Sequence, residues 1–253
     1  METALSEILR IVENPEELAH AAAELFRDSA QQAITELGRF SVALSGGTTP
    51  QRLFRRLGTS YRKKIAWDKV HLFWSDERCV PRDHEQSNFR LAYDELISCI
   101  WIPSENIHRI KGELRAGDAA GYYETEMTRH FRDDLPVFDL IMLGVGADGH
   151  TASLFPGSEA LGEKQRLALP VFSSTSLHWR VTLTLPVLNT AKQVLFVVGG
   201  RSKAGIVGSL IGRKESHRYP AAMVKPSAGS ITWLLDRDAA AELPENVISS
   251  LFR

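Results

Sequence analysis

The sequence has only two cysteines, no long hydrophobic run and almost no net charge. Cys79 and Cys99 form no CxxC pair, which argues against a disulfide framework or a structural zinc site and favours a reducing cytoplasm. The longest apolar runs, such as residues 138–143 and Gln193–Val198, have the length of strands and fall short of the ~18 residues that a membrane span needs. We therefore expect no membrane segment.

The charges are balanced, with 30 lysines and arginines against 31 aspartates and glutamates. Such a chain lacks the positive field with which dedicated nucleic-acid-binding proteins attract phosphates. The N-terminal segment METALSEILR has neither a basic region nor an apolar core, so it does not predict a secretory signal. No repeat, linker or obligate protein partner is evident, and we expect one domain over residues 1–253, located in the cytoplasm.

Helical and strand patterns alternate along the chain. The first helix is predicted to begin after Asn14, with Pro15 in its first turn and Glu17 completing a capping box. It is predicted to end before Gly38, and a later helix is predicted to be capped by Asp118. Strands are predicted at Phe40–Leu44, Val70–Trp74, 138–143, 180–185, Gln193–Val198 and 231–235. This alternation predicts a mostly parallel α/β sheet with helices on both faces.

In folds of this class, ligands bind beyond the carboxyl ends of the strands. The first strand-to-helix loop is Ser45-Gly46-Gly47-Thr48, and Pro50 is expected to open the helix after it. Converging backbone N–H groups, hydroxyls and the helix dipole would make this loop an anion site. A tight turn with capping hydroxyls explains the same residues equally well. The loop lacks the Gly-Lys-Ser/Thr ending of a nucleotide-binding P-loop.

The loop after residues 138–143 matches the spacing G-x-G-x-x-G of dinucleotide-binding folds. We reject that interpretation because Asp148 and His150 crowd the turn, and Pro156 leaves no room for a long helix. The loop instead offers His150 as an acid–base group, with Asp148 two positions away. A lone histidine in a loop is as often a capping or surface residue, so both interpretations stay open at this point.

Two more strand ends carry charges that suit an anion. Lys203 follows two glycines and would lie in the first turn of a helix, where a cation is unfavourable unless an anion is bound beside it. Arg78 is suited to grip a phosphate, and Asp76 to cap a helix or bind a sugar hydroxyl. An exposed lysine and a solvated cluster of ion pairs are the alternatives. His71 is expected to pack in the core, and the histidines show no metal-ligand spacing, so no metal is predicted.

Six segments together resemble one enzyme family. They are LSGGTTP at 44–50, VHLFWSDERCVP at 70–81, QSN at 86–88, FDLIMLGVGADGHTASLFPGS at 138–158, RVTLTLPVLNTA at 180–191 and GGRSKA at 199–204. In this order they resemble the glucosamine-6-phosphate isomerase/6-phosphogluconolactonase family over nearly the whole chain, and its lactonases most closely. The resemblance implies a Rossmann-like α/β fold shared with glucosamine-6-phosphate deaminases, ribose-5-phosphate isomerases and coenzyme A transferases.

The resemblance also implies an activity, the hydrolysis of 6-phospho-D-glucono-1,5-lactone to 6-phospho-D-gluconate in the oxidative pentose phosphate pathway. The substrate is then a small sugar phosphate, and no cofactor is needed. By motif position, His150 matches the family's general base, whereas Lys203 and Arg78 match substrate contacts. The loop at 45–48 matches the turn that binds the sugar phosphate, and Arg180, just before a strand, fits a phosphate ligand. Whether Asp148 orients the histidine is left open.

Two other functions remain as alternatives. A glucosamine-6-phosphate deaminase shares these loops, but its corresponding loop continues with an Asn-Glu-Pro segment whose acid partners the histidine. This chain has Leu154-Phe155-Pro156 there, and because phenylalanine cannot relay a proton, the lactonase is favoured. A sugar-phosphate-binding protein without catalysis would not need a base at His150, and a turnover assay separates that possibility from an enzyme.

Overall fold

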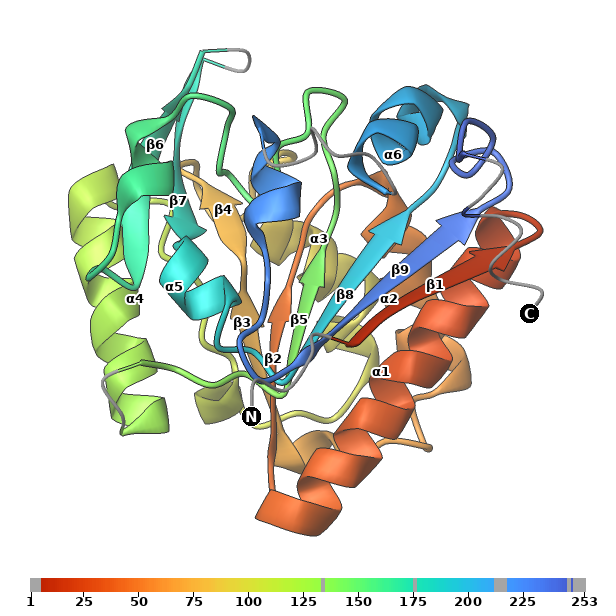
Figure 1. The fold of residues 1–253 in the computed structure, drawn as a ribbon. Helices are drawn as coiled ribbons and strands as arrows, with labels where there is room; N and C mark the ends of the chain where they lie inside the picture. Colours follow the sequence, from red (N-terminus) through yellow and green to blue (C-terminus); the bar gives the residue numbers. More distant parts are fainter. Residues whose placement is uncertain (1–5, 133–134, 175–176, 212–217, 245–246, 248–253) are drawn as a thin grey trace.

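The computed structural model describes residues 6–132, 135–174, 177–211, 218–244 and 247. Its centre is a six-stranded sheet in the order β1-β9-β8-β5-β2-β3, in which all neighbouring strands are parallel (Figure 1). The strands are β1 (Ser6–Val12), β2 (Phe40–Leu44), β3 (Val70–Trp74), β5 (Leu140–Leu143), β8 (Gln193–Val198) and β9 (Ser230–Asp236). The predicted mostly parallel α/β sheet is therefore confirmed.

A second, antiparallel sheet stands at the carboxyl end of β3. It consists of β4 (Asp76–Arg78), β7 (His178–Leu183) and β6 (Ala168–Ser173), in the order β4-β7-β6. Only Ser75 separates β3 from β4, so the chain passes directly from the central sheet into the small one. The register of β4 on β7 places Arg78 opposite Arg180, which brings two cationic side chains from distant segments to one place.

Helices connect the strands and cover the central sheet. The α-helices are α1 (Pro15–Leu37), α2 (Thr48–Ser60), α3 (Asn88–Glu95), α4 (Ala116–Phe131), α5 (Leu185–Leu188) and α6 (Ala204–Leu210). Short 3-10 turns are η1 (Trp67–Lys69), η2 (Ile97–Cys99), η3 (Ser104–Asn106), η4 (Glu159–Gly162), η5 (Arg201–Lys203) and η7 (Pro220–Met223). Every residue of β2 and β5 is buried, so both faces of the sheet are covered there.

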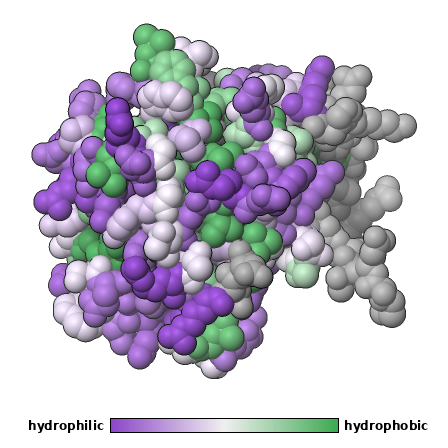
Figure 2. Space-filling view, turned by 90° about the vertical axis from the view of Figure 1, so that its left-hand side faces the viewer, coloured by the Kyte–Doolittle hydropathy of each residue, from purple (hydrophilic) through white to green (hydrophobic). Residues whose placement is uncertain are grey.

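Two groups of helices lie at different sides of the molecule. Helix α1 packs against α2 at one side, whereas α4 packs against β6 and β7 at the other (Figure 1). The side that carries α4, β6 and β7 is mostly hydrophilic, and its apolar side chains form small separate groups (Figure 2). None of the described helices has the length and apolarity that a membrane crossing requires.

The local signals in the sequence explain where most elements begin and end. The side chain of Asn14 accepts hydrogen bonds from the backbone N–H groups of Glu16 and Glu17, each at 3.0 Å, and Gly38 ends α1 with a φ of 74°. These two caps are as predicted, but Glu17 accepts from the backbone N–H of Glu13 at 3.1 Å instead of that of Asn14, so the predicted capping box is wrong. Helix α4, however, begins two residues before Asp118, so this acid lies inside the first turn and is not the cap.

Three strands were not predicted. β1 and β6 lie at sheet edges, where one side of the strand has no neighbour and no continuous apolar run is needed. β4 has three residues, too few to show a pattern. The strand predicted at 180–185 is β7, but it begins earlier, at His178, and belongs to the small antiparallel sheet.

Candidate active site

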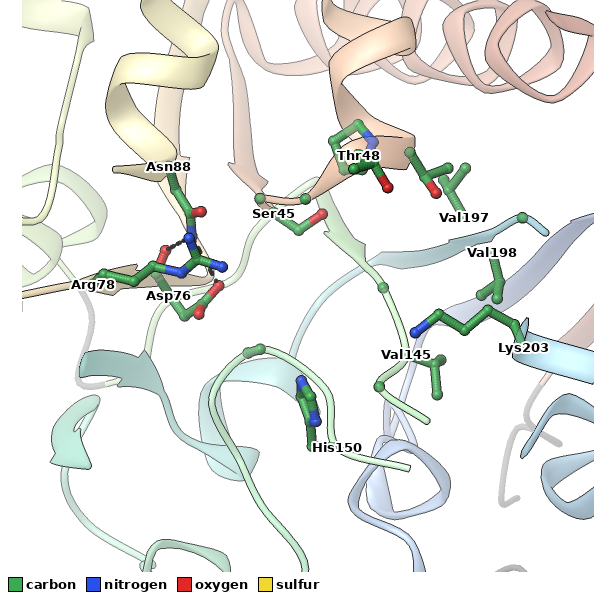
Figure 3. Close-up of a pocket in the computed structure, with 18 of the residues that line it drawn as sticks. Ser45, Thr48, Asp76, Arg78, Asn88, Val145, His150, Val197, Val198 and Lys203 are labelled. Carbon is green, nitrogen blue, oxygen red and sulfur yellow. Dashed lines mark hydrogen bonds between the residues drawn. The ribbon is translucent and has the colours of Figure 1, made fainter. Parts of the chain in front are cut away.

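The loops that follow β2, β3, β5 and β8 surround a cavity of about 230 Å³ at the carboxyl edge of the central sheet (Figure 3). The predicted site residues that line it are Ser45, Gly46, Gly47, Thr48, Asp76, Arg78, His150, Arg180 and Lys203. Asp148 lies outside the cavity lining and contacts His150. The fold therefore brings all the predicted residues together.

The loop at 45–48 leads into the N-terminus of α2. The helix begins at Thr48, two residues before Pro50, and follows Gly47, whose φ of 106° is one that other residues rarely adopt. Among the described residues no side chain caps this end, and no acidic residue lies in its first turn. Because first-turn N–H groups lack intrahelical partners and the helix dipole is positive there, this cavity wall is suited to an anion.

Asn88 is a cavity residue that was not predicted. It lies at the start of α3, and its Nδ2 donates to the backbone oxygen of Asp76 at 2.9 Å and to the carboxylate of Asp76 at 3.3 Å. Gly46 permits this arrangement, because a Cβ at that position would overlap the Asn88 side chain. The only signal in the sequence was the place of Asn88 at the end of the QSN motif.

His150 is held by a tight turn in the loop after β5. Its Nδ1 lies 2.6 Å from Oδ1 of Asp148, and its backbone N–H donates to the same oxygen at 3.1 Å. Gly149 makes the turn with a φ of 82°. Gly146 lies against the ring, and a Cβ there would overlap the imidazole. The ring points into the cavity (Figure 3).

The Asp148–His150 contact orients the imidazole ring and selects its tautomer. Burial raises the pKa of Asp148, but the hydrogen bonds and charge of His150 outweigh it, and the pKa lies below its ordinary value. Asp148 is therefore ionised at neutral pH and accepts a hydrogen bond from Nδ1 of His150. This contact selects the tautomer whose Nε2 carries the lone pair, which is the arrangement of a general base.

Asp76 is buried and bonded to several side chains. Ser153 Oγ donates to its Oδ2 at 2.7 Å, and Nη1 of Arg180 lies 3.9 Å from the same oxygen. Asp76 is only 5% exposed, so the alternative interpretation of this strand end as a solvated ion-pair cluster is wrong. Its contacts fix Arg180 at the cavity wall.

Arg78 extends to the cavity from β4, and its Nη1 donates to the backbone oxygen of Gln86 at 2.6 Å. Its neighbour Glu77 is buried and accepts hydrogen bonds from the backbone N–H groups of Asn88 and Phe89, at 2.8 and 2.7 Å. Burial raises the pKa of Glu77 to about 7, against the lowering effect of these N–H groups. Glu77 was not predicted, and it anchors the segment that carries Asn88.

Lys203 borders the cavity on the side of β8. It lies in η5, directly before α6, and not in the first turn of an α-helix as predicted. The turn is anchored by the N–H of Gly200, which donates to the buried carboxylate of Asp236 at 3.0 and 2.9 Å. The side chain of Lys203 points into the cavity and has no hydrogen bond or ion pair with any residue that the structure describes (Figure 3).

The cavity is electrostatically positive. Arg78, Arg180 and Lys203 line it, whereas the lining carboxylate of Asp76 is already engaged in hydrogen bonds. Together with the N-terminus of α2, these side chains suit a phosphorylated or carboxylated ligand. Residues 144–158 contain no helix, as the rejection of a dinucleotide-binding turn required.

Comparisons with known proteins agree with these features. The family model described as glucosamine-6-phosphate isomerases/6-phosphogluconolactonase matches residues 13–233. A 6-phosphogluconolactonase from Rattus norvegicus is 39% identical over 238 residues, 92% of this chain and 92% of that protein. The solved structure of 6-phosphogluconolactonase from Thermotoga maritima is 32% identical with a TM-score of 0.80, and the match covers 91% of this chain and 100% of that one.

A more distant likeness concerns the fold alone. A monomeric glucosamine-6-phosphate deaminase is 21% identical with a TM-score of 0.75, and the match covers 93% of this chain and 99% of that one. The six motifs, the cavity at the carboxyl edge of the sheet and the family model that spans most of the sequence all agree. The chain therefore belongs to the glucosamine-6-phosphate isomerase/6-phosphogluconolactonase family.

Proposed function

We propose that this chain hydrolyses 6-phospho-D-glucono-1,5-lactone to 6-phospho-D-gluconate, the second step of the oxidative pentose phosphate pathway. The observation that carries the proposal is the pair of His150 and Asp148, with Nδ1 2.6 Å from Oδ1, at a cavity lined by Arg78, Arg180 and Lys203. An oriented neutral imidazole and a cationic wall are what the hydrolysis of a phosphorylated lactone requires.

His150 acts as the general base. Nε2 takes a proton from a water molecule whose oxygen attacks the lactone carbonyl carbon C1, and Asp148 stabilises the imidazolium that forms. Negative charge develops on the carbonyl oxygen, where Arg78 or the N–H groups of the glycine loops donate hydrogen bonds. The bond from C1 to the ring oxygen then breaks, and the leaving oxygen takes the proton from His150. General-base catalysis of this kind contributes ~10²–10⁴-fold.

The phosphate binds at the cationic wall of the cavity. Lys203 has a side chain without a described partner, and the loop of Ser45 to Thr48 adds hydroxyls and the N-terminus of α2. Arg180, positioned by Asp76, adds a guanidinium to the same wall. Because the phosphate is remote from C1, its binding energy orients the carbonyl toward His150.

A deaminase of the same family is the second candidate. Its chemistry moves protons between sugar carbons and therefore needs an acid that partners the histidine. In this chain Phe155 stands beside His150, with ring centroids 4.9 Å apart, and a phenyl ring cannot carry a proton. The acid that contacts His150 is Asp148, which lies outside the cavity. This placement favours the lactonase.

We also propose that the chain works as one domain in the cytoplasm, on a small molecule and without an obligate protein partner. Cys79 and Cys99 are both free, as in a reducing compartment. One hydrophobic cluster includes residues of both sheets, such as Val42 and Val181, which supports a single domain.

The direct test is turnover by the purified chain. Freshly prepared 6-phosphogluconolactone is added at constant pH, and the acid that hydrolysis produces is titrated against the unaided reaction. Glucosamine 6-phosphate is tested in parallel, with ammonia release as the readout. Lactone hydrolysis well above background with no ammonia is expected. Ammonia release alone would assign the chain to the deaminases, and neither reaction would leave a sugar-phosphate-binding protein.

A further inference from the structure

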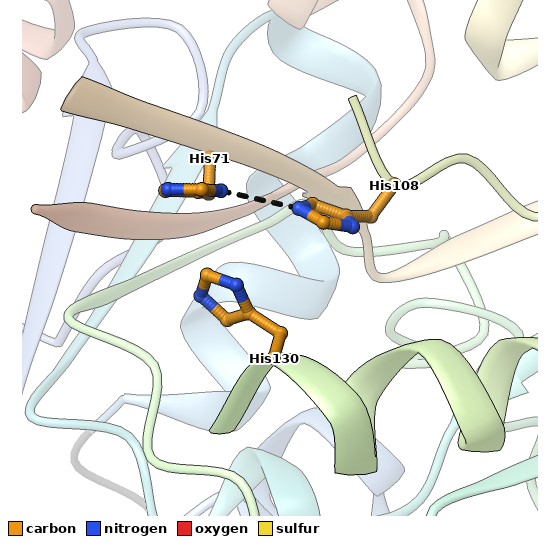
Figure 4. Close-up of side chains that lie close together, drawn as sticks. All are labelled: His71, His108 and His130. Carbon is orange, nitrogen blue, oxygen red and sulfur yellow. Dashed lines mark hydrogen bonds between the residues drawn. The ribbon is translucent and has the colours of Figure 1, made fainter. Parts of the chain in front are cut away.

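Three histidines meet at the other end of the central sheet from the cavity. His71 is the second residue of β3, His108 follows η3, and His130 lies in the last turn of α4 (Figure 4). The segment of His108 runs beside β3, because the N–H of His108 donates to the backbone oxygen of Leu72 at 2.8 Å. These histidines have no metal-ligand spacing along the chain, and only the fold brings their rings together.

One pair of ring nitrogens has nearly the separation that a metal requires, and a nitrogen of the third ring lies close by. A tetrahedral zinc ion with bonds of ~2.0–2.1 Å places its ligand nitrogens about 3.3–3.4 Å apart. His71 Nδ1 and His108 Nε2 are 3.2 Å apart, and one ligand atom from each ring lies within 4.8 Å of the other two. We propose that His71, His108 and His130 bind one divalent zinc-like ion through three imidazole nitrogens, with water in the fourth position.

The second nitrogen of two rings lies near an oxygen, within hydrogen-bond distance for His130 and at ion-pair distance for His108. Nδ1 of His108 lies 3.7 Å from Oε2 of Glu126, and Nε2 of His130 lies 2.8 Å from Oγ of Ser41. Metal-binding histidines commonly donate their free N–H to a carboxylate or another oxygen, which fixes the ring and raises its basicity. These contacts leave Nε2 of His108 and Nδ1 of His130 for the ion.

The charges around the three rings act on an added cation in opposite ways. The positive charge of Arg39 opposes it, whereas the carboxylate of Glu126, 3.7 Å from Nδ1 of His108, favours it. All three histidines are partly exposed, so an ion has a path to them.

The site acts on stability, not on the proposed reaction. The ion ties β3, the segment after η3 and the end of α4 together, and it binds the folded chain only. Binding to the native state alone raises the unfolding temperature with ion concentration. At ~100 times the dissociation constant, a rise of about 5 °C is expected for a chain of this size.

The test begins with the full chain, freed of metal by a chelator and dialysed. Co²⁺ is titrated in, and the strong visible absorption of tetrahedral cobalt is recorded, followed by displacement with Zn²⁺. One ion per chain with a tetrahedral spectrum and a Zn²⁺-dependent rise in the unfolding temperature are expected. Absence of the tetrahedral spectrum would overturn the proposal and leave three packed, hydrogen-bonded histidines.

Variants assign the ion to these rings. His108→Gln and His130→Gln should each weaken Zn²⁺ binding ~10–100-fold. His20→Gln is the matched control, because His20 is a histidine on α1 with a 50% exposed side chain. Lactone turnover should persist in all three variants. Measured turnover in a variant then shows that this variant is folded.

His150→Asn separates this site from the cavity. A cobalt spectrum that survives in this variant supports the proposal, even where a cluster variant does not fold. Loss of the cobalt spectrum in His150→Asn would place the ion in the cavity and overturn the proposal. Unchanged Zn²⁺ binding in folded His108→Gln and His130→Gln would also overturn it, because the ion would then lie elsewhere.

Discussion

Catalysis is expected to depend most on His150. His150→Asn keeps a similar side-chain size and hydrogen bonding but cannot take a proton. We expect kcat to fall by ~10²-fold or more, with binding of 6-phosphogluconate near the wild-type value. The rate of unaided lactone hydrolysis is subtracted. If the variant keeps more than about a tenth of kcat, another group activates the water, and Asp148 is the first candidate.

The pH dependence of the same reaction identifies the base. Because a general base must be unprotonated to take the proton, kcat/KM should rise with pH along one ascending limb. Asp148 adds no limb near neutral pH, because its pKa lies below its ordinary value and it stays ionised. The ascending limb should disappear in His150→Asn. A limb that persists in that variant belongs to a different group.

Lys203 is expected to bind the phosphate. Its side chain has no partner among the described residues, so Lys203→Ala should leave the unfolding temperature nearly unchanged. We expect kcat/KM for the phosphorylated lactone to fall about 10–100-fold, the value of one or two charged hydrogen bonds. Unphosphorylated gluconolactone should change far less. The matched control is Arg201→Ala, an exposed cation in the same turn, and equal losses on both substrates would contradict the phosphate role.

At the scale of elements, the loop after β5 can hold the His150 ring only because residue 146 is a glycine. A Cβ at Gly146 would overlap the His150 ring, so Gly146→Ala should displace the ring from Asp148. We expect kcat to fall at least ~10-fold while the chain stays folded. Gly144→Ala is the control, because a Cβ there meets nothing within 4 Å. Equal kcat in both variants would show that the ring position does not limit turnover.

The link between β4 and α3 depends on Glu77. Its pKa is about 7 in the folded chain against an ordinary value of 4.5, so the folded state holds the proton more tightly. The contribution of this tighter proton binding to the free energy of unfolding is fully present below about pH 4.5 and is lost as pH rises through about 7. The free energy of unfolding of the wild type, relative to Glu77→Gln, should therefore fall by about 3 kcal/mol over this range.

Urea unfolding of the wild type and of Glu77→Gln at several pH values measures this difference, and other titrating groups cancel in it. A difference that stays constant with pH would mean that the N–H groups of Asn88 and Phe89 offset burial, and one that rises with pH would mean that they outweigh it. Glu77 would then be an ordinary ionised carboxylate at the N-terminus of α3.

At the scale of the whole molecule, turnover and metal binding occupy opposite ends of the sheet. Among the residues that the structure describes, the histidine cluster of His71, His108 and His130 is the candidate metal site, and it lies outside the cavity. Lactone hydrolysis should therefore persist in excess chelator at temperatures where the chain is folded. Loss of kcat on chelation, restored by one metal ion, would contradict a reaction that uses only His150 and water.

Much of the fold and of the site was predictable because the signals are local. Caps at Asn14 and Gly38 and the apolar runs of β2, β3 and β8 depend on neighbouring residues only. The edge strands β1 and β6 and the short β4 carry no such signal. That residues 1–253 form one domain stays a prediction.

The sequence by itself determined the strand-to-helix loops and the spacing of Asp148 and His150, because turns and caps act over a few residues. Only the tertiary structure decided which distant groups meet. The antiparallel register of β4 on β7 set Arg78 opposite Arg180, and the packing of α3 set Asn88 against Asp76. Such contacts join residues up to about 100 positions apart in the sequence and depend on strand register and packing. No local sequence pattern encodes them. For the same reason, the cluster of His71, His108 and His130 appears only in the folded chain.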